Sequence, residues 1–106
     1  MENRSHPRLA YEEKSLTGAF RLADGSYGEF RLQGRNISRG GVSVLSERMV
    51  DRDTLGNVML PTHSGEMIAV RASVRRCRPV EGGYELGIKF DESLDRASFK
   101  ELVIER

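Results

Sequence analysis

The amino-acid sequence predicts an all-β fold, a six-stranded antiparallel β-barrel with a flexible N-terminal arm and a C-terminal α-helix. Short stretches in which apolar and polar residues alternate recur along the chain, and glycines, prolines and aspartates separate them. Only the C-terminal tail has apolar residues at the spacing of an α-helix. The 106 residues fit one domain, and a hydrophobic fraction of 38% supports one modest core.

The first thirteen residues are mostly polar and charged, and Pro7 lies among them. We therefore expect an arm over residues 1–13 and a single barrel domain with its helix over residues 14–106. No apolar signal core follows Arg8, and no apolar run approaches the roughly 20 residues that a membrane helix needs. One cysteine, Cys77, cannot form an internal disulfide, so we expect a soluble cytoplasmic protein that does not enter a membrane.

The expected strands follow from alternation and turn signals. Residues 15–22 carry apolar side chains such as Phe20 at a spacing of two, and Asp24-Gly25 then supplies a hairpin turn. A turn-rich segment over residues 35–41 follows the second strand. The later expected strands are residues 27–33, a third beginning at Val42, residues 55–60 closed by Pro61, residues 66–78, and residues 84–90 after a turn at 79–83.

The tail is the helical segment. Ser93 or Asp95 can cap a helix that runs to about Ile104, and Phe99 and Leu102 lie at helical spacing within it.

The charge balance argues against binding that is driven by nucleic-acid phosphates. Lysine and arginine total 17 against 16 acidic residues, a formal net charge of +1. The basic residues are mostly arginine, with lysine only at Lys14, Lys89 and Lys100. Since arginine offers a planar fork for phosphate and a face for stacking, this composition indicates a few local anion sites, with a coding bias toward arginine as the alternative.

Groups that catalyse reactions are sparse. The histidines His6 and His63 and the lone Cys77 do not form a set of zinc ligands at close spacing. The sequence has no phosphate-binding glycine loop with its lysine and no nucleophile elbow. We therefore expect no catalytic residues, no metal site and no cofactor, and hence a protein that is not an enzyme.

Two short segments carry residues suited to an anionic ligand. In the first, Arg4 and Arg8 are four residues apart, and Pro7 disfavours a helix between them, so a bent arm can aim both guanidinium groups at one anion. In the second, Asn36 and Ser38 flank Ile37 and share a face at strand spacing. The alternatives are a solvated basic tail for the first segment and a plain turn for the second.

Together the segments resemble the paired signature of the PilZ family, an RxxxR arm followed by a [D/N]xSxxG segment on the barrel. Here the first is Arg4 to Arg8, and the second is Asn36, Ser38 and Gly41. The late strand Tyr84–Phe90, with Gly87 three residues before Phe90, is also similar to the family's late barrel strand. The likeness covers nearly the whole chain.

The resemblance implies a receptor for the bacterial second messenger cyclic di-GMP. It implies that Arg4 and Arg8 pair with phosphate and stack on guanine, that Asn36 and Ser38 hydrogen-bond a guanine edge, and that Gly41 lets the ligand pack on the backbone. Secondary contacts are expected from neighbouring residues, namely Asn3, Ser5, Arg35, Arg39 and Gly40.

We expect the arm to become ordered when the ligand binds, and the ordered arm then presents a surface to an effector protein. Two alternatives stay open: a small barrel that binds RNA or single-stranded nucleic acid, and a PilZ-like adaptor that binds no nucleotide. The aromatic content of 7%, without tryptophan, argues against the first because stacking platforms are scarce. The presence of Arg4, Arg8, Asn36 and Ser38 argues against the second.

Overall fold

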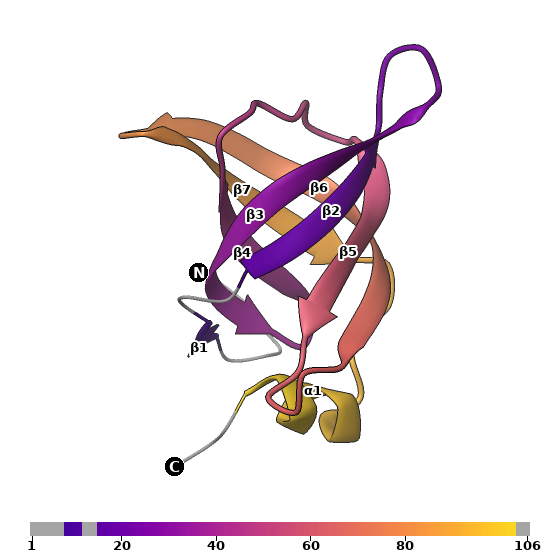
Figure 1. The fold of residues 1–106 in the computed structure, drawn as a ribbon, viewed down its shortest axis with the longest axis vertical. Coiled ribbons are helices and arrows are strands. Elements are labelled where there is room, and N and C mark those ends of the chain that lie inside the picture. The colour runs from indigo at the N-terminus through magenta and orange to yellow at the C-terminus, as the bar shows by residue number, and fades with distance from the viewer. Residues whose placement is uncertain (1–7, 12–14, 104–106) are drawn as a thin grey trace, which may run out of the picture.

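The structure, a computed structural model, describes residues 8–11 and 15–103. Within these ranges the chain is mostly β-strand, and one short helix follows the last strand (Figure 1). The elements are β1 Leu9–Ala10, β2 Ser15–Arg21, β3 Tyr27–Ser38, β4 Gly41–Ser46, β5 Leu55–Pro61, β6 Met67–Val80, β7 Gly83–Phe90 and α1 Arg96–Leu102.

The strands close into a barrel. Their order in the sheet is β1-β3-β2-β5-β6-β7-β4, and a further pairing of β3 with β4 joins the two sides. Every pairing is antiparallel. The long strand β3 closes the barrel, because its first half pairs with β2 and its second half pairs with β4. The predicted six-stranded antiparallel barrel with a C-terminal helix is therefore confirmed, and β1 is an additional short strand.

The core occupies the inside of the barrel, where alternate residues of each strand point. Phe20 of β2 and Phe30 of β3 meet there edge to face, with ring centroids 5.4 Å apart and an interplanar angle of 73°. Phe20 is completely buried, and several aliphatic side chains of the same core cluster are also 0% exposed, namely Ile37, Val44, Val58, Leu60, Val74 and Leu86. The alternation that predicted the strands is therefore the alternation that fills the barrel.

Two of the strand glycines lie against a backbone carbonyl of the neighbouring strand. A Cβ at Gly41 of β4 would lie 2.4 Å from the carbonyl oxygen of Ile88 in β7. A Cβ at Gly56 of β5 would lie 2.3 Å from the carbonyl oxygen of Ala19 in β2. Neither distance leaves room for a side chain, so both strand contacts depend on glycine.

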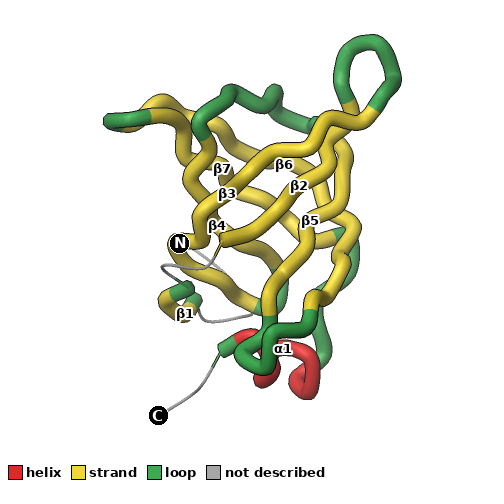
Figure 2. Tube along the Cα trace, in the orientation of Figure 1, coloured by secondary structure: helices red, strands yellow, loops and turns green. Residues whose placement is uncertain are grey.

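The helix is fixed at the end of the barrel that carries the β3–β4 turn (Figure 2). Asp95 is its N-cap, since the Ser98 amide donates to Asp95 Oδ1 at 2.7 Å, and this hydrogen bond holds the pKa of Asp95 below its usual value. Arg39 Nε donates to the Leu94 carbonyl at 2.6 Å, and the Leu94 amide donates to the Arg39 carbonyl at 2.7 Å. The helix thus packs Phe99 and Leu102 against the barrel and ends at Leu102, while the predicted end, Ile104, lies outside the described residues.

Two strands are longer than the sequence predicts. β3 continues through Ser38, so the expected turn-rich segment is strand at residues 35–38, and the turn itself is only Arg39–Gly40. Pairing on both edges, with β1 and with β4, explains why this segment stays extended. β6 continues through Pro79 to Val80, and proline is tolerated there because the pairing of β6 with β5 ends at Ser73.

No helix in residues 8–11 and 15–103 has the length and apolar character needed to cross a membrane.

Candidate functional site

Asn36 and Ser38 lie at the C-terminal end of β3, on the outer face of the barrel. Ile37 between them is fully buried, whereas Asn36 and Ser38 are half-buried. The prediction that the two polar side chains share a face while Ile37 enters the core is therefore confirmed. Their position on a closed barrel gives both side chains a rigid support.

The Ser38 hydroxyl takes part in the β3–β4 turn. The Gly40 amide donates to Ser38 Oγ at 3.2 Å, and Ser38 Oγ donates to the Gly41 carbonyl at 3.5 Å. Arg39 extends from the same turn toward the start of the helix, through its hydrogen bond with the Leu94 carbonyl. The serine, arginine and glycines of this segment therefore shape the turn that carries them, in addition to any role with a ligand.

A β-bulge in β3 aims Asn36 outward. Gly34 pairs with Val44 and Asn36 pairs with Ser43, so Arg35 is an extra residue on β3 at this point. Arg35 is exposed. Bulges of this kind redirect the side chains that follow them, and they are common beside functional sites. Alternation alone did not reveal this bulge, since it depends on the partner strand.

β1 brings the arm beside these residues. Leu9 pairs with Ile37, and Ala10 pairs with Asn36. Extended by one residue, the same antiparallel register places Arg8 opposite Ser38, and Arg8 is exposed. The structure therefore brings together three of the predicted ligand residues: Arg8, Asn36 and Ser38. The others on the arm, Asn3, Arg4 and Ser5, lie outside the described residues.

Tyr11 anchors the segment around β1 to the barrel. The sequence predicted a flexible arm through residue 13 instead. The Tyr11 side chain is 2% exposed, its hydroxyl donates to the Pro61 carbonyl at 2.8 Å, and its amide donates to the Arg35 carbonyl at 3.0 Å. A Cβ at Gly34 would lie 2.3 Å from the Tyr11 carbonyl oxygen, so the backbone of Tyr11 can pack this close to β3 only because residue 34 is a glycine. Burial raises the pKa of the Tyr11 hydroxyl above its usual value. A single aromatic residue within a polar segment was the signal that could have identified this anchor.

Replacing Tyr11 with phenylalanine is expected to lower the free energy of unfolding by about 1 kcal/mol, because the half-buried Pro61 carbonyl loses its donor. Urea denaturation of the two proteins measures the difference. Tyr27→Phe is the matched control, since Tyr27 is 58% exposed and its loss of a hydroxyl should leave the unfolding midpoint in place. Equal shifts in the two variants would contradict the anchoring role of the Tyr11 hydroxyl.

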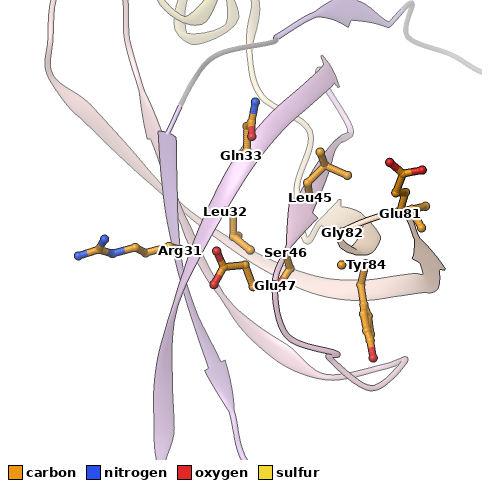
Figure 3. Close-up of a pocket in the computed structure, with 11 residues that line it drawn as sticks. Arg31, Leu32, Gln33, Leu45, Ser46, Glu47, Glu81, Gly82 and Tyr84 are labelled. Carbon is orange, nitrogen blue, oxygen red and sulfur yellow. The ribbon is translucent and has the colours of Figure 1, made fainter.

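A cavity of about 390 Å³ lies elsewhere on the barrel. It is bounded by residues 31–33 of β3, the end of β4 and the β6–β7 turn, and Figure 3 shows Leu45, Ser46 and Tyr84 among the side chains around it. These residues lie toward the opposite end of the β3–β4 hairpin from Asn36 and Ser38. None of the predicted ligand residues in the described part of the chain lines this cavity.

Cys77 is half-buried and packs against the core, as expected for a small residue of a barrel strand. His63 is exposed. Within residues 8–11 and 15–103, no group of three or more His, Cys, Asp or Glu side chains could hold a metal ion.

The sequence and the fold were both compared with known proteins. The family model described as the PilZ domain matches residues 2–105. No curated protein matches the chain. Among solved structures, the Bacillus subtilis inhibitor of motility (MotI/DgrA) is similar with a TM-score of 0.67 and 17% identity, over 96% of this chain and 49% of that protein.

Two further structures are similar to the chain. One is the PilZ domain with c-di-GMP of YcgR from Escherichia coli, with a TM-score of 0.66 and 14% identity over 95% of this chain and 86% of that one. The other is the K. pneumonia MrkH–c-di-GMP complex, with a TM-score of 0.60 and 17% identity over 96% of this chain and 50% of that one. The chain thus spans about half the length of MotI and of MrkH. At these identities the structural likeness concerns the fold.

Proposed function

The chain belongs to the PilZ domain family, and on this premise we propose that it is a receptor for cyclic di-GMP. The ligand binds on the outer face of the barrel, across the C-terminal end of β3 and the arm beside it. The observation that supports this proposal is the β1–β3 register, in which Leu9 pairs with Ile37 and Ala10 with Asn36, so that Arg8 is the next residue of the arm on the side of Ser38.

The chemistry of these residues suits a ligand with two phosphates and two guanines. Arg8 forms charge-assisted hydrogen bonds with a phosphate, and its planar group also stacks on a base. Asn36 offers both a donor and an acceptor to the edge of a guanine, and Ser38 retains acceptor capacity beyond its bond from Gly40. Arg4, four residues before Arg8, supplies the second guanidinium group from the arm.

The neighbouring residues have supporting roles in this proposal. Gly41 lets the start of β4 pack against the Ile88 carbonyl of β7, and without a side chain it leaves the backbone there open to the ligand. Gly40 and Arg39 hold the turn, while Arg35 and the arm residues Asn3 and Ser5 approach the ligand from its rim. The ligand orders the arm before Leu9, and an effector protein reads the surface that the arm and the ligand form together.

Calorimetric titration with cyclic di-GMP tests the proposal. We expect saturable binding by the parent protein, and an affinity about 10- to 100-fold weaker for Arg8→Ala, because a charge-assisted hydrogen bond contributes about 1.5–3 kcal/mol. The matched control is Arg21→Ala, which removes an exposed arginine at the far end of β2 and should bind as the parent does.

GTP in place of cyclic di-GMP controls for general nucleotide binding and should give no heat of binding. A parent protein that fails to bind cyclic di-GMP would overturn the proposal and favour the adaptor that binds no nucleotide. If the Arg8→Ala protein bound cyclic di-GMP as tightly as the parent, Arg8 and the arm would not be part of the binding site.

A further inference from the structure

A second surface of the barrel has apolar side chains that face solvent. β2 and β5 pair with each other and lie side by side in Figure 1, and β6 continues the sheet beyond β5. We call the outward residues of these strands the β2–β5 face: Thr17, Ala19, Leu55, Asn57, Met59 and Met67. Three of the six large apolar side chains that are exposed in the described part of the chain belong to it, namely Leu55 at 54%, Met59 at 36% and Met67 at 53%. Clustered apolar side chains on an outer surface are typical of a protein–protein contact.

Opposite charges lie at the two ends of one cross-strand row on this face. Ala19 of β2 pairs with Glu29 of β3 on one side and with Asn57 of β5 on the other. Asn57 pairs in turn with Arg71 of β6. The row across four strands therefore runs Glu29, Ala19, Asn57, Arg71. Both charged ends are exposed, and no ion pair between described residues involves either of them.

The residues between these charged ends differ in size from strand to strand. In the neighbouring row Thr17 of β2 pairs with Met59 of β5, and in the charged row Ala19 pairs with Asn57. The β2 residue is the smaller one in both rows, so the face has short side chains along β2 and longer ones along β5. None of the four is charged. An uncharged centre that contains methionine, with charges at its rim, is the usual composition of a protein interface.

A two-fold rotation makes this face complementary to itself. An axis that runs along the strands, midway between β2 and β5, places β5 of each copy over β2 of the other. The long Met59 side chain of one copy then meets the short Thr17 of the second copy, and the inner surfaces can interdigitate. The same rotation places Glu29 of each copy over Arg71 of the other, and because the interface is isologous this ion pair forms twice.

We infer that the β2–β5 face docks against the same face of a second copy of this chain. Charge complementarity favours this occupant, because a surface with one negative and one positive end is matched at both ends by its own rotated image. A partner of a single charge would match only one end and would be repelled at the other. The proposed ligand site lies at the far end of β3, where that strand pairs with β4, so the inference stands independently of the proposed function.

Analytical ultracentrifugation without cyclic di-GMP, from low to high micromolar protein, tests the inference. We expect a monomer–dimer equilibrium for the parent. Glu29→Arg and Arg71→Glu each place two pairs of like charges at the interface, so each should raise the dissociation constant at least about tenfold. An equimolar mixture of the two variants should dimerise about as the parent does, because positions 29 and 71 then again have opposite charges across the interface.

Met59→Glu tests the apolar centre of the face. It places a charge where the two copies exclude water, so it should also raise the dissociation constant at least about tenfold. Met49→Glu is the matched control, since Met49 is 61% exposed and lies between β4 and β5, outside the face. This variant should dimerise as the parent does.

Three results would overturn the inference. A parent protein that stays monomeric at the highest concentration has no such interface. A dimer that survives both charge reversals, or a mixture of the two variants that dimerises no better than each alone, uses another surface or another arrangement. Equal weakening by Met59→Glu and Met49→Glu would trace the effect to net charge. Because the ligand is absent throughout, none of these results bears on whether the protein binds cyclic di-GMP.

Discussion

Phe20→Ala is expected to lower the free energy of unfolding by about 3–5 kcal/mol, the usual range for truncating a buried phenylalanine. Phe20 is 0% exposed and lies edge to face against Phe30 at 5.4 Å, so the substitution removes both apolar burial and an aromatic pair. A small domain has about 5–15 kcal/mol of stability in total. The variant should therefore lose between about one fifth and all of the parent's stability, measured by urea denaturation.

Tyr27→Ala is the matched control for Phe20→Ala. It removes an aromatic side chain that is 58% exposed at the start of β3, in the strand that pairs with β2. Its free energy of unfolding should change by no more than about 0.5 kcal/mol. If the two truncations were equally destabilising, the packing inside the barrel would not be the main source of its stability.

Gly41→Ala is expected to lower the free energy of unfolding by about 1–3 kcal/mol, the usual cost of overpacking. The added Cβ would lie 2.4 Å from the Ile88 carbonyl oxygen, and a backbone atom in a closed barrel cannot move aside as a flexible side chain would. β4 and β7 must separate locally, and this displaces the turn that carries Ser38. We therefore also expect cyclic di-GMP binding to weaken in this variant, as a consequence of the displaced turn.

Gly87→Ala is the control for Gly41→Ala, because it shows how much the replacement of a strand glycine by alanine changes stability without such a clash. Gly87 lies on β7 in the same outer face, but the three atoms nearest to its Cβ would all belong to the Arg76 side chain, at 3.4 Å or more. Its unfolding midpoint should match that of the parent. An equally stable Gly41→Ala protein with weakened binding would instead indicate that Gly41 acts on the ligand directly, as the resemblance to the family implied.

The barrel was predictable because its interior is filled by alternate residues of each strand, a pattern that is local in the sequence. The ends of the strands were less predictable. Asn, Ser and Gly at positions 36–41 favour turns locally, yet pairing with β1 and β4 keeps β3 extended through Ser38. Pro79 indicated a turn, but it lies on a part of β6 that β5 does not reach. In both cases partner strands, which are distant in sequence, decided the outcome.

The same distinction applies to the candidate site. The outward placement of Asn36 and Ser38 followed from a spacing of two around Ile37. The bulges at Arg35 and Arg75 did not, because a bulge is defined only by the residues that face it across the strand pair. The anchoring of Tyr11 was missed for a similar reason, since its partners, Pro61 and Gly34, lie in two other strands.

The anchor at Tyr11 makes the arm a tether of defined length. Arg8 directly precedes Leu9, which pairs with Ile37, and Arg4 precedes Arg8 by four residues. The α-carbons of Arg4 and Arg8 are therefore within about 14 Å of each other in any conformation. In the proposed receptor, a ligand bound at Arg8 would meet Arg4 as an intramolecular partner whose effective concentration is on the order of millimolar. The second arginine would then strengthen binding without a separate encounter, and the length of chain between the anchor and Arg4 would set how much it contributes.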